Sequence, residues 1–359
     1  MAAAKQVIVV GAGIIGASIA WHLAEAGAAV TIVDAARPGG VATANSFAWI
    51  NASWGNPEPY FRLRMRAIAE WTRLKTAVDA IPLAWCGGLC WDLPPQGLEA
   101  FAAEHAAWGY GIRRVDCAGA ARIEPNLAEL PDFAVHVAGE GAVEPAVAAQ
   151  VLIEDAVRRG AKLITGTRVE ALVRDNDRVV GAETADGALA ADDVVLAAGV
   201  AAPDLAAAVA VGLPILTPAG LLVHSRPHGA DRLLNGLVLA NRLHMRQTAA
   251  GRIVGGEFGG DDPGADPADT ARALFAEMQA MLVGGDRLEL DFHTIGYRPM
   301  PTDGFPIIGR AAGIEGLYVA VMHSGITLAP AVGLFAAQEI LAGCRDPLLQ
   351  PYGLSRFAG

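Results

Sequence analysis

Residues 7–34 read VIVVGAGIIGASIAWHLAEAGAAVTIVD, the strongest structural signal in the sequence. A four-residue apolar run precedes a glycine-rich turn, which is followed by a helical run, a second apolar run and the acid Asp34. The order strand, tight turn, helix, strand and acid is the pattern of a dinucleotide-binding βαβ unit. The turn consists of Gly11, Ala12, Gly13, Ile14, Ile15 and Gly16.

Each residue type in this stretch has a physical reason. Gly11 permits the sharp turn, Gly13 lets the backbone approach a pyrophosphate, and Gly16 lets helix and strand pack closely. The free N–H groups at the helix start would bind the phosphates. Asp34 follows at about the 20-residue spacing at which a carboxylate binds ribose hydroxyls and repels a 2′-phosphate. We therefore expect a dinucleotide without that phosphate, and the stretch alone leaves FAD and NAD open.

Composition sets the class of protein. A chain of 359 residues exceeds the roughly 250–300 at which single cores divide, so two domains are expected. Hydrophobic residues at 53% and charged residues at 18% are typical of a globular α/β enzyme. The net charge of −11 argues against a nucleic-acid partner, which would require a basic face.

The cysteines and apolar runs indicate the compartment. Four scattered cysteines lack the spacing of a zinc site, so we expect reduced thiols, no metal and a cytoplasmic location. The apolar start runs directly into the nucleotide turn, without the features of a signal peptide. The longest apolar region, residues 205–223, is interrupted by glycine and proline, so we expect no membrane span.

The order of strand types predicts a fold in two parts. The buried strand at residues 193–196 returns to parallel-sheet character, whereas residues 242–247 and 252–256 alternate as an antiparallel hairpin. We expect an α/β fold, α+β overall, with a discontinuous Rossmann-like nucleotide domain and a second substrate domain built on an antiparallel sheet. The nucleotide domain would span 1–80, 137–213 and 296–359, and the substrate domain 81–136 and 214–295.

A helix predicted from Glu58 to about Val78 carries several arginines. We expect these arginines to form a solvated face rather than a phosphate site. They are Arg62, Arg64, Arg66 and Arg73.

Two stretches near the carboxyl terminus complete the pattern: GYRPMPTDGFPIIG at 296–309 and YVAVMHSGITLAPAVG at 318–333. The second predicts a strand, a turn and a long helix, whose N-terminus would stabilise a group that gains negative charge, as a reduced flavin does. Together with GAGIIG, Asp34 and DVVLAAG at 193–199, these stretches resemble the FAD-dependent amino-acid oxidoreductases, the family of D-amino-acid oxidase, glycine oxidase and sarcosine oxidase. The motifs look most like the glycine oxidase branch.

The resemblance implies FAD as the cofactor, held non-covalently, because the cysteine or 40s-loop histidine that attaches flavin in some relatives has no counterpart here. Its ADP half would lie on the glycine turn and Asp34, its adenine end near the Val169 backbone, and its flavin O2 and N1 edge at the start of the last helix. The implied cofactor residues are Gly11, Ala12, Gly13, Ile14, Ile15, Gly16, Asp34, Ala42, Thr43, Ser46, Phe47, Ala48, Val169, Gly199, Gly325, Ile326 and Thr327.

Four residues are candidates for substrate chemistry. Arg298 matches the arginine that binds the substrate carboxylate in the family. His244 falls where relatives place a pocket tyrosine, and Arg246 lies on the same strand face, where it would be a second cation if that face lines the pocket and a solvated residue if not. His323 would lie at the flavin edge or in the pocket, or else be a core or helix-capping histidine.

These residues imply oxidation of the C–N bond of an amino acid or related amine, such as a D-amino acid, glycine or an N-substituted amino acid. Hydride would leave Cα for flavin N5, giving an imine that water hydrolyses. The electron acceptor would be oxygen or another, unidentified partner, and a homo-oligomer is possible. The alternatives are a 2-hydroxy-acid dehydrogenase of the same fold, a non-catalytic flavin-binding subunit, and a nicotinamide-binding protein.

Overall fold

The computed structural model describes residues 4–53, 55–229, 232–257 and 263–357. A six-stranded sheet carries the nucleotide motif, in the order β21-β22-β13-β1-β2-β9. All neighbours are parallel except β21 and β22. The strands are β1 (Gln6–Val10), β2 (Ala29–Asp34), β9 (Lys162–Thr165), β13 (Asp193–Leu196), β21 (Ile307–Arg310) and β22 (Leu317–Val321).

Helices cover both faces of this sheet. One face packs against α1 (Ile14–Glu25), α3 (Glu58–Ala77), α6 (Pro145–Arg158) and α9 (Gly325–Ala342). The other face packs against α7 (Ala202–Ala207) and a small antiparallel sheet of β10 (Val169–Asp175), β11 (Arg178–Thr184) and β12 (Gly187–Ala190). Because the central strands β1 and β13 are covered on both sides, their sequences are continuous apolar runs.

Helix α9 is the one described helix that is long and apolar enough to cross a membrane. Most of it is buried inside the protein, among α1, α3 and the six-stranded sheet. This is the environment of a core helix.

An eight-stranded sheet forms the other large layer, in the order β19-β15-β18-β17-β16-β5-β7-β6. It is antiparallel apart from the parallel pair β5 and β16. Its strands are β5 (Gly88–Trp91), β6 (Ile112–Asp116), β7 (Phe133–Val137), β15 (Ala219–Ser225), β16 (Leu237–Ala240), β17 (His244–Gln247), β18 (Ile253–Gly256) and β19 (Leu290–Tyr297). Helices α4 (Pro95–Ala107), α5 (Cys117–Ile123) and α8 (Pro267–Ala280) pack on it.

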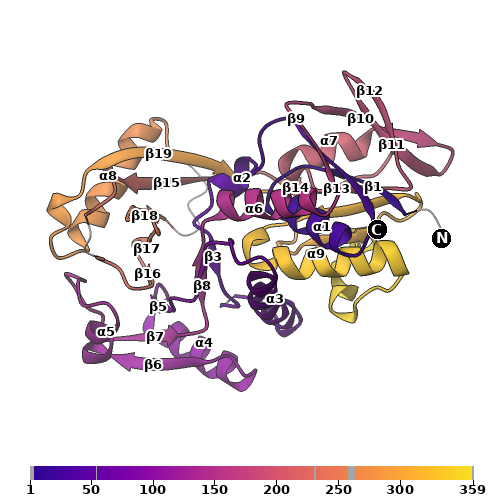
Figure 1. The fold of residues 1–359 in the computed structure, drawn as a ribbon. Coiled ribbons are helices and arrows are strands. Elements are labelled where there is room, and N and C mark those ends of the chain that lie inside the picture. Colours follow the sequence, from indigo (N-terminus) through magenta and orange to yellow (C-terminus); the bar gives the residue numbers. More distant parts are fainter. Residues whose placement is uncertain (1–3, 54, 230–231, 258–262, 358–359) are drawn as a thin grey trace.

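A small sheet of β3 (Trp49–Ile50), β8 (Gly141–Val143) and β4 (Leu83–Ala84) lies between the two large layers (Figure 1). Strands β14 (Ile215–Leu216) and β20 (Met300–Pro301) form a separate pair. The 40s loop, residues 37–48 with the short helix α2 (Val41–Ala44), leads into β3. The 40s loop, which carries predicted cofactor residues, therefore lies where the chain passes between the two large sheets.

The fold class is confirmed: a parallel, Rossmann-like sheet is combined with a largely antiparallel one. The domain boundaries stay a prediction. The helix with four arginines and the hairpin of β17 and β18 form where the sequence predicted them. Residues 81–126 form β4, β5, α4, β6 and α5.

Candidate active site

The glycine turn is packed so tightly that side chains would not fit. Gly11 has a φ of +104°, and a Cβ there would lie 2.5 Å from the carbonyl oxygen of Ala197. A Cβ on Gly16 would collide with the carbonyl oxygen of Gly11. The turn therefore lies directly against residues 197 and 198, which follow β13, and the predicted Gly199 is the next residue in the chain.

Hydrogen bonds fix the backbone around this turn. The Asp34 carboxylate accepts the N–H of Ala12 at 2.6 Å and that of Ala36 at 2.7 Å. Thr43 Oγ1 accepts the N–H of Ile14 at 3.1 Å. Asp34 and Thr43 therefore contact the start of α1 from opposite ends of the loop that joins them.

The predicted adenine end lies close by. Asp34 is the register partner of Thr165 in β9, and its carbonyl accepts the N–H of Thr167 at 3.1 Å. Two residues later, Val169 starts β10 and is buried with Val33 in the same core. Val169 thus approaches the end of β2.

The start of α9 meets the same region. A Cβ on Gly325 would lie 3.4 Å from Ile15 Cγ1, so the first turn of α9 lies against the glycine turn. Thr327 Oγ1 donates to the Trp49 carbonyl at 3.2 Å and accepts the Asn51 N–H at 3.3 Å. Ile326 is buried in the core of α9. The start of α9 is thereby fixed to β3.

The 40s loop closes the space between these segments. Ala48 has a φ of +63°, and its N–H donates to Ser46 Oγ at 3.1 Å. Asn45 Nδ2 donates to the Ile295 carbonyl of β19 at 3.2 Å. Ala42 lies on α2, beside Thr43. Phe47 faces β17, as described below.

These segments fit the cofactor that the sequence implied. Two helix N-termini, of α1 and α9, are each favourable for negative charge. The glycine turn leaves backbone rather than side chains facing a dinucleotide, with Asp34 at the strand end where a ribose carboxylate is expected. The predicted residues of the turn, the 40s loop and α9 therefore come together in one place.

One face of the eight-stranded sheet is turned toward the 40s loop. His244, Gly256, Leu222 and Thr294 are direct neighbours across β17, β18, β15 and β19, so they point to one side of the sheet. Two residues along β19 from Thr294, a Cβ on Gly296 would lie 3.0 Å from Asn45 Cβ. We call this side the loop-facing side.

Arg298 lies at the end of that side. Its Nη2 donates to the Ala219 carbonyl at 2.6 Å, and its N–H donates to the Pro218 carbonyl at 2.9 Å. A Cβ on Gly220 would lie 3.7–3.8 Å from the guanidinium, an ordinary contact distance, so the Arg298 side chain lies against Gly220.

His244 is buried and oriented by an acid. Its Nε2 lies 3.0 Å from Asp92 Oδ2, and both side chains are almost fully buried. The rings of Phe47 and Trp49 contact its imidazole, with centroids about 6 Å away. His244 is therefore a polar group held against the 40s loop.

Arg246 also faces the 40s loop, which agrees with its predicted position on the same strand face as His244. It is buried, so it is not the solvated residue that was the alternative. Its Nε donates to the Phe47 carbonyl at 2.6 Å and its Nη1 to Glu144 Oε1 at 3.0 Å. These contacts favour a bracing role over that of a second cation for the substrate.

His323 precedes α9 and is half-buried. Its Nδ1 lies 3.3 Å from Ser324 Oγ. Ser324 has a φ of +57°, which bends the chain into the helix. His323 is thus placed beside the predicted flavin edge.

Sequence reasoning missed a buried acid next to this site. Glu140 accepts hydrogen bonds from the Tyr110 hydroxyl and from Trp49 Nε1, the latter at 2.8 Å. Burial raises the pKa of Glu140 from 4.5 to about 7, although the two donors oppose the change. Asp92 and Glu140 lie on short strands and turns where no pattern marks them, so only their charge in apolar surroundings could have drawn attention to them.

The predicted basic face of α3 is wrong at one position. Arg62, Arg66 and Arg73 are partly exposed and pair with Glu58 or Glu70, whereas Arg64 is buried. Its Nε and Nη2 donate to the carbonyl and side-chain oxygens of Asn51 at 3.0 and 2.7 Å. Arg64 occupies the apolar side of the helix because it lies four residues after Tyr60 and three before Ala67, which are both buried.

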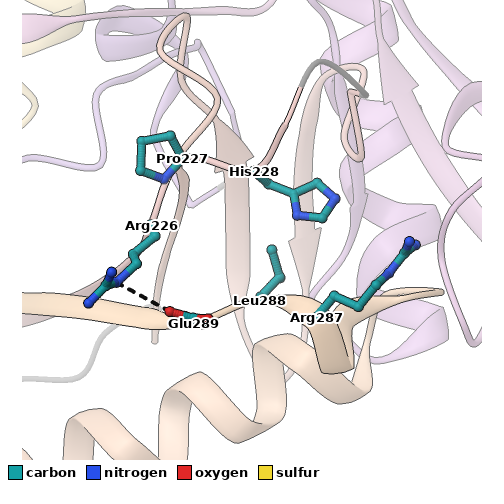
Figure 2. Close-up of a pocket in the computed structure, with 6 residues that line it drawn as sticks. All are labelled: Arg226, Pro227, His228, Arg287, Leu288 and Glu289. Carbon is teal, nitrogen blue, oxygen red and sulfur yellow. Dashed lines mark ion pairs between the residues drawn. The ribbon is translucent and has the colours of Figure 1, made fainter.

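A separate cavity of about 300 Å³ contains none of the predicted site residues (Figure 2). It lies beyond the end of β15 opposite Ala219, so the length of that strand separates it from Arg298. Its Arg226 and Glu289 form an ion pair at 3.3 Å with largely exposed side chains. The lining residues are Arg226, Pro227, His228, Arg287, Leu288 and Glu289. Within the described ranges, no group of three or more metal-ligating side chains could hold an ion.

Known proteins are similar to this chain in sequence and architecture. Residues 6–339 match the model of a family described as "FAD dependent oxidoreductase". Glycine oxidase of Pseudomonas putida is 30% identical, with 97% of each chain covered. Glycine oxidase of Geobacillus kaustophilus superimposes with a TM-score of 0.87 at 25% identity, over 99% of this chain and 100% of that one. Iminodiacetate oxidase of Chelativorans sp. BNC1 superimposes with a TM-score of 0.85 at 25% identity, over 97% of this chain and 98% of that one.

These matches confirm the resemblance drawn from the motifs and FAD as the cofactor. With the glycine turn, Asp34 and the start of α9 brought together as the motifs predicted, the chain belongs to the family of FAD-dependent oxidoreductases.

Proposed function

We propose that the protein oxidises the C–N bond of a small amino acid or an N-substituted amino acid. The observation that carries this proposal is the position of Arg298, which lies over Gly220 at the end of the loop-facing side of the substrate sheet. A guanidinium can bind a carboxylate through two parallel hydrogen bonds, which fixes the orientation of an amino acid. The names of the relatives, glycine oxidase and iminodiacetate oxidase, support the same substrate class.

The cofactor would be held by the residues that converge on the glycine turn. Backbone N–H groups at the start of α1 would bind the pyrophosphate, Asp34 the ribose, and Gly325 to Thr327 the flavin edge. When bound, FAD supplies the two-electron acceptor that no side chain can provide. The protein supplies binding and orientation, and we expect the FAD to be released intact on denaturation because it is not covalently attached.

His244 would be the second polar group of the pocket. Asp92 fixes its ring, and Phe47 and Trp49 restrict the space around it. Bulky aromatic walls favour a small substrate, such as glycine, an N-substituted glycine or a small D-amino acid. With its ring fixed by Asp92, His244 would present a polar group to the substrate amine.

The test is an anaerobic titration of the purified holoprotein. Glycine, N-substituted glycines, D- and L-amino acids and 2-hydroxy acids are added separately while the flavin absorbance is recorded. We expect bleaching by one of the amino-acid groups. Bleaching by hydroxy acids alone would replace the proposal with a hydroxy-acid dehydrogenase, and no bleaching by any group would favour a non-catalytic flavoprotein.

The electron acceptor is tested in the same cuvette. Air is readmitted after reduction, and the rate at which the absorbance returns separates an oxidase from a dehydrogenase that passes electrons to another partner. We favour an oxidase, because the 30% identical relative is named glycine oxidase and the superimposed iminodiacetate oxidase is also an oxidase, whereas D-amino acid dehydrogenases are 25–27% identical. A cytoplasmic location and a homo-oligomer stay proposals, to be tested by fractionation and by light scattering.

A further inference from the structure

Helix α3 holds a guanidinium on its buried side. The buried positions 60, 64, 67, 71 and 74 recur at the three- and four-residue spacing of one helix face. Only 7% of Arg64 is exposed, and its neighbours on this face are apolar or aromatic. Its guanidinium lies 5.4 Å from the centre of the Tyr60 ring.

The positive charge of Arg64 has no carboxylate partner among the described residues. Both of its hydrogen bonds go to Asn51, a neutral residue. The acid whose pKa it influences, Glu140, is bonded to Tyr110 and Trp49 instead, and burial raises the pKa of that acid to about 7. Keeping a buried cation without a paired acid is unfavourable, which suggests that an anion stabilises it in the working protein.

The residues around Arg64 contact the start of α9. Asn51, which binds the guanidinium, donates its N–H to Thr327 Oγ1 at 3.3 Å. Trp71, two turns after Arg64 on the same face of α3, donates to the carbonyls of Ile326 and Thr327 at 3.0 and 3.1 Å. The buried side of α3 therefore lies against the first turn of α9.

We propose that Arg64 is a buried positive charge that makes the bound flavin easier to reduce. The inference rests on the proposed position of the flavin O2 and N1 edge at Gly325 to Thr327. Reduction adds negative charge to that edge, and a fixed cation in a low-dielectric setting stabilises this charge. Arg64 acts through its electrostatic field and through its hydrogen bonds to Asn51, without contacting the substrate. It is therefore a positioning residue.

The experiment replaces Arg64 in the FAD-bound protein and measures two properties of the flavin. Sulfite adds as a nucleophile to oxidised flavin at N5 and leaves an anionic adduct, so its affinity reports the local field without any amino acid. In R64M we expect sulfite affinity to fall about 10- to 100-fold, as for the loss of one nearby charge. If the equilibrium constant for two-electron reduction falls by the same 10- to 100-fold, the midpoint potential falls by about 30 to 60 mV.

Two variants serve as controls. R64K keeps the positive charge, so its sulfite affinity should remain within about threefold of the wild-type value. The electrostatic field of the charge does not depend on the planar shape of the guanidinium. R66M removes an arginine two residues away on α3 that is 43% exposed and paired with Glu70, and should leave both properties unchanged. If R64M does not retain FAD, R64Q and R64K give the same contrast, because glutamine can still donate to Asn51 without a charge.

Two results would overturn the inference. Wild-type sulfite affinity and potential in R64M or R64Q would show that the flavin does not sense this charge. Equal losses in R64K and R64M would show that Arg64 braces Asn51 through its fork and not through its charge. Neither measurement needs an amino-acid substrate, so a flavin that no amino acid reduces would remove the proposed function and leave this result standing.

Discussion

Arg246 Nε donates to the carbonyl oxygen of Phe47 at 2.6 Å, and this bond joins the substrate sheet to the 40s loop across 199 positions of sequence. The same guanidinium binds Glu144 at the start of α6. One side chain therefore fixes three elements, β17, the 40s loop and α6, next to the predicted cofactor site.

Replacing Arg246 by methionine should weaken the fold more than the chemistry. The change leaves the Phe47 carbonyl and the Glu144 carboxylate without their donor, and we expect the free energy of unfolding to fall by about 2–4 kcal/mol. Urea denaturation of the holoprotein measures this. R242M is the matched control, because Arg242 forms an exposed pair with Glu277 and its loss should change stability by less than about 0.5 kcal/mol. A raised KM for amino acids at unchanged stability would instead assign Arg246 to the substrate pocket.

Replacing Arg298 by methionine should damage substrate binding selectively. Loss of a charge-assisted bond worth about 1.5–3 kcal/mol or more raises the KM for carboxylate substrates by a factor of about ten to a thousand. R298K keeps the positive charge but lacks the planar guanidinium, so its KM should lie between those of the wild type and R298M. Steady-state kinetics with an amino acid and with the matching amine that lacks the carboxylate measures this. An unchanged KM across several amino acids would remove Arg298 from the pocket.

Replacing Gly16 by alanine should disrupt the nucleotide turn through sterics alone. The added methyl would collide with the Gly11 carbonyl, which is backbone and cannot rotate away. Overpacking of this kind costs about 1–3 kcal/mol or more, and we expect FAD affinity to fall at least about tenfold. The control is G212A, where a methyl would meet no atom within 4 Å. FAD titration of the apoproteins decides, and equal affinity in both variants would contradict the packing described here.

Replacing Glu140 by glutamine should change how stability depends on pH. The pKa of Glu140 is raised from 4.5 to about 7, so the folded state holds a proton that the unfolded chain has lost in this interval. Stability from this group is full below about pH 4.5 and is lost as the pH rises through 7. At about 1.4 kcal/mol per pKa unit, the wild type should lose about 3 kcal/mol between these limits that E140Q does not lose.

Urea denaturation of both proteins at pH 5 and pH 8.5 tests this prediction. Other titrating groups contribute to both proteins, so the quantity of interest is the difference between the two pH dependences. Parallel curves for wild type and E140Q would show that the Glu140 carboxyl ionises in its ordinary range.

The parts of the site that the sequence predicted are those with local signals. Gly11, Gly16 and Asp34 are recognisable because strand, turn and helix follow each other within one βαβ unit, and Arg298 because it lies in a long motif. Arg64 and Glu140 could not be placed in this way. Arg64 is an arginine like its partly exposed neighbours Arg62 and Arg66. Its burial depends on which side of α3 packs against α9. Glu140 lies before the short strand β8, whose partners β3 and β4 are more than 50 positions earlier in the chain, so pairing over long distances decides its environment.

The order in which the chain is synthesised has a consequence for how the cofactor is acquired. Strand β1 pairs with β13, which is about 190 residues later, and the glycine turn packs against Ala197 just after that strand. The start of α9, which lies against Ile15, is made about 130 residues later still. On the ribosome the first βαβ unit therefore emerges before β13, which pairs with β1, and before the residues that pack against the glycine turn. Since long-range pairings form late in folding, FAD should bind only after α9 has been synthesised, and nascent chains truncated before α9 should not retain it.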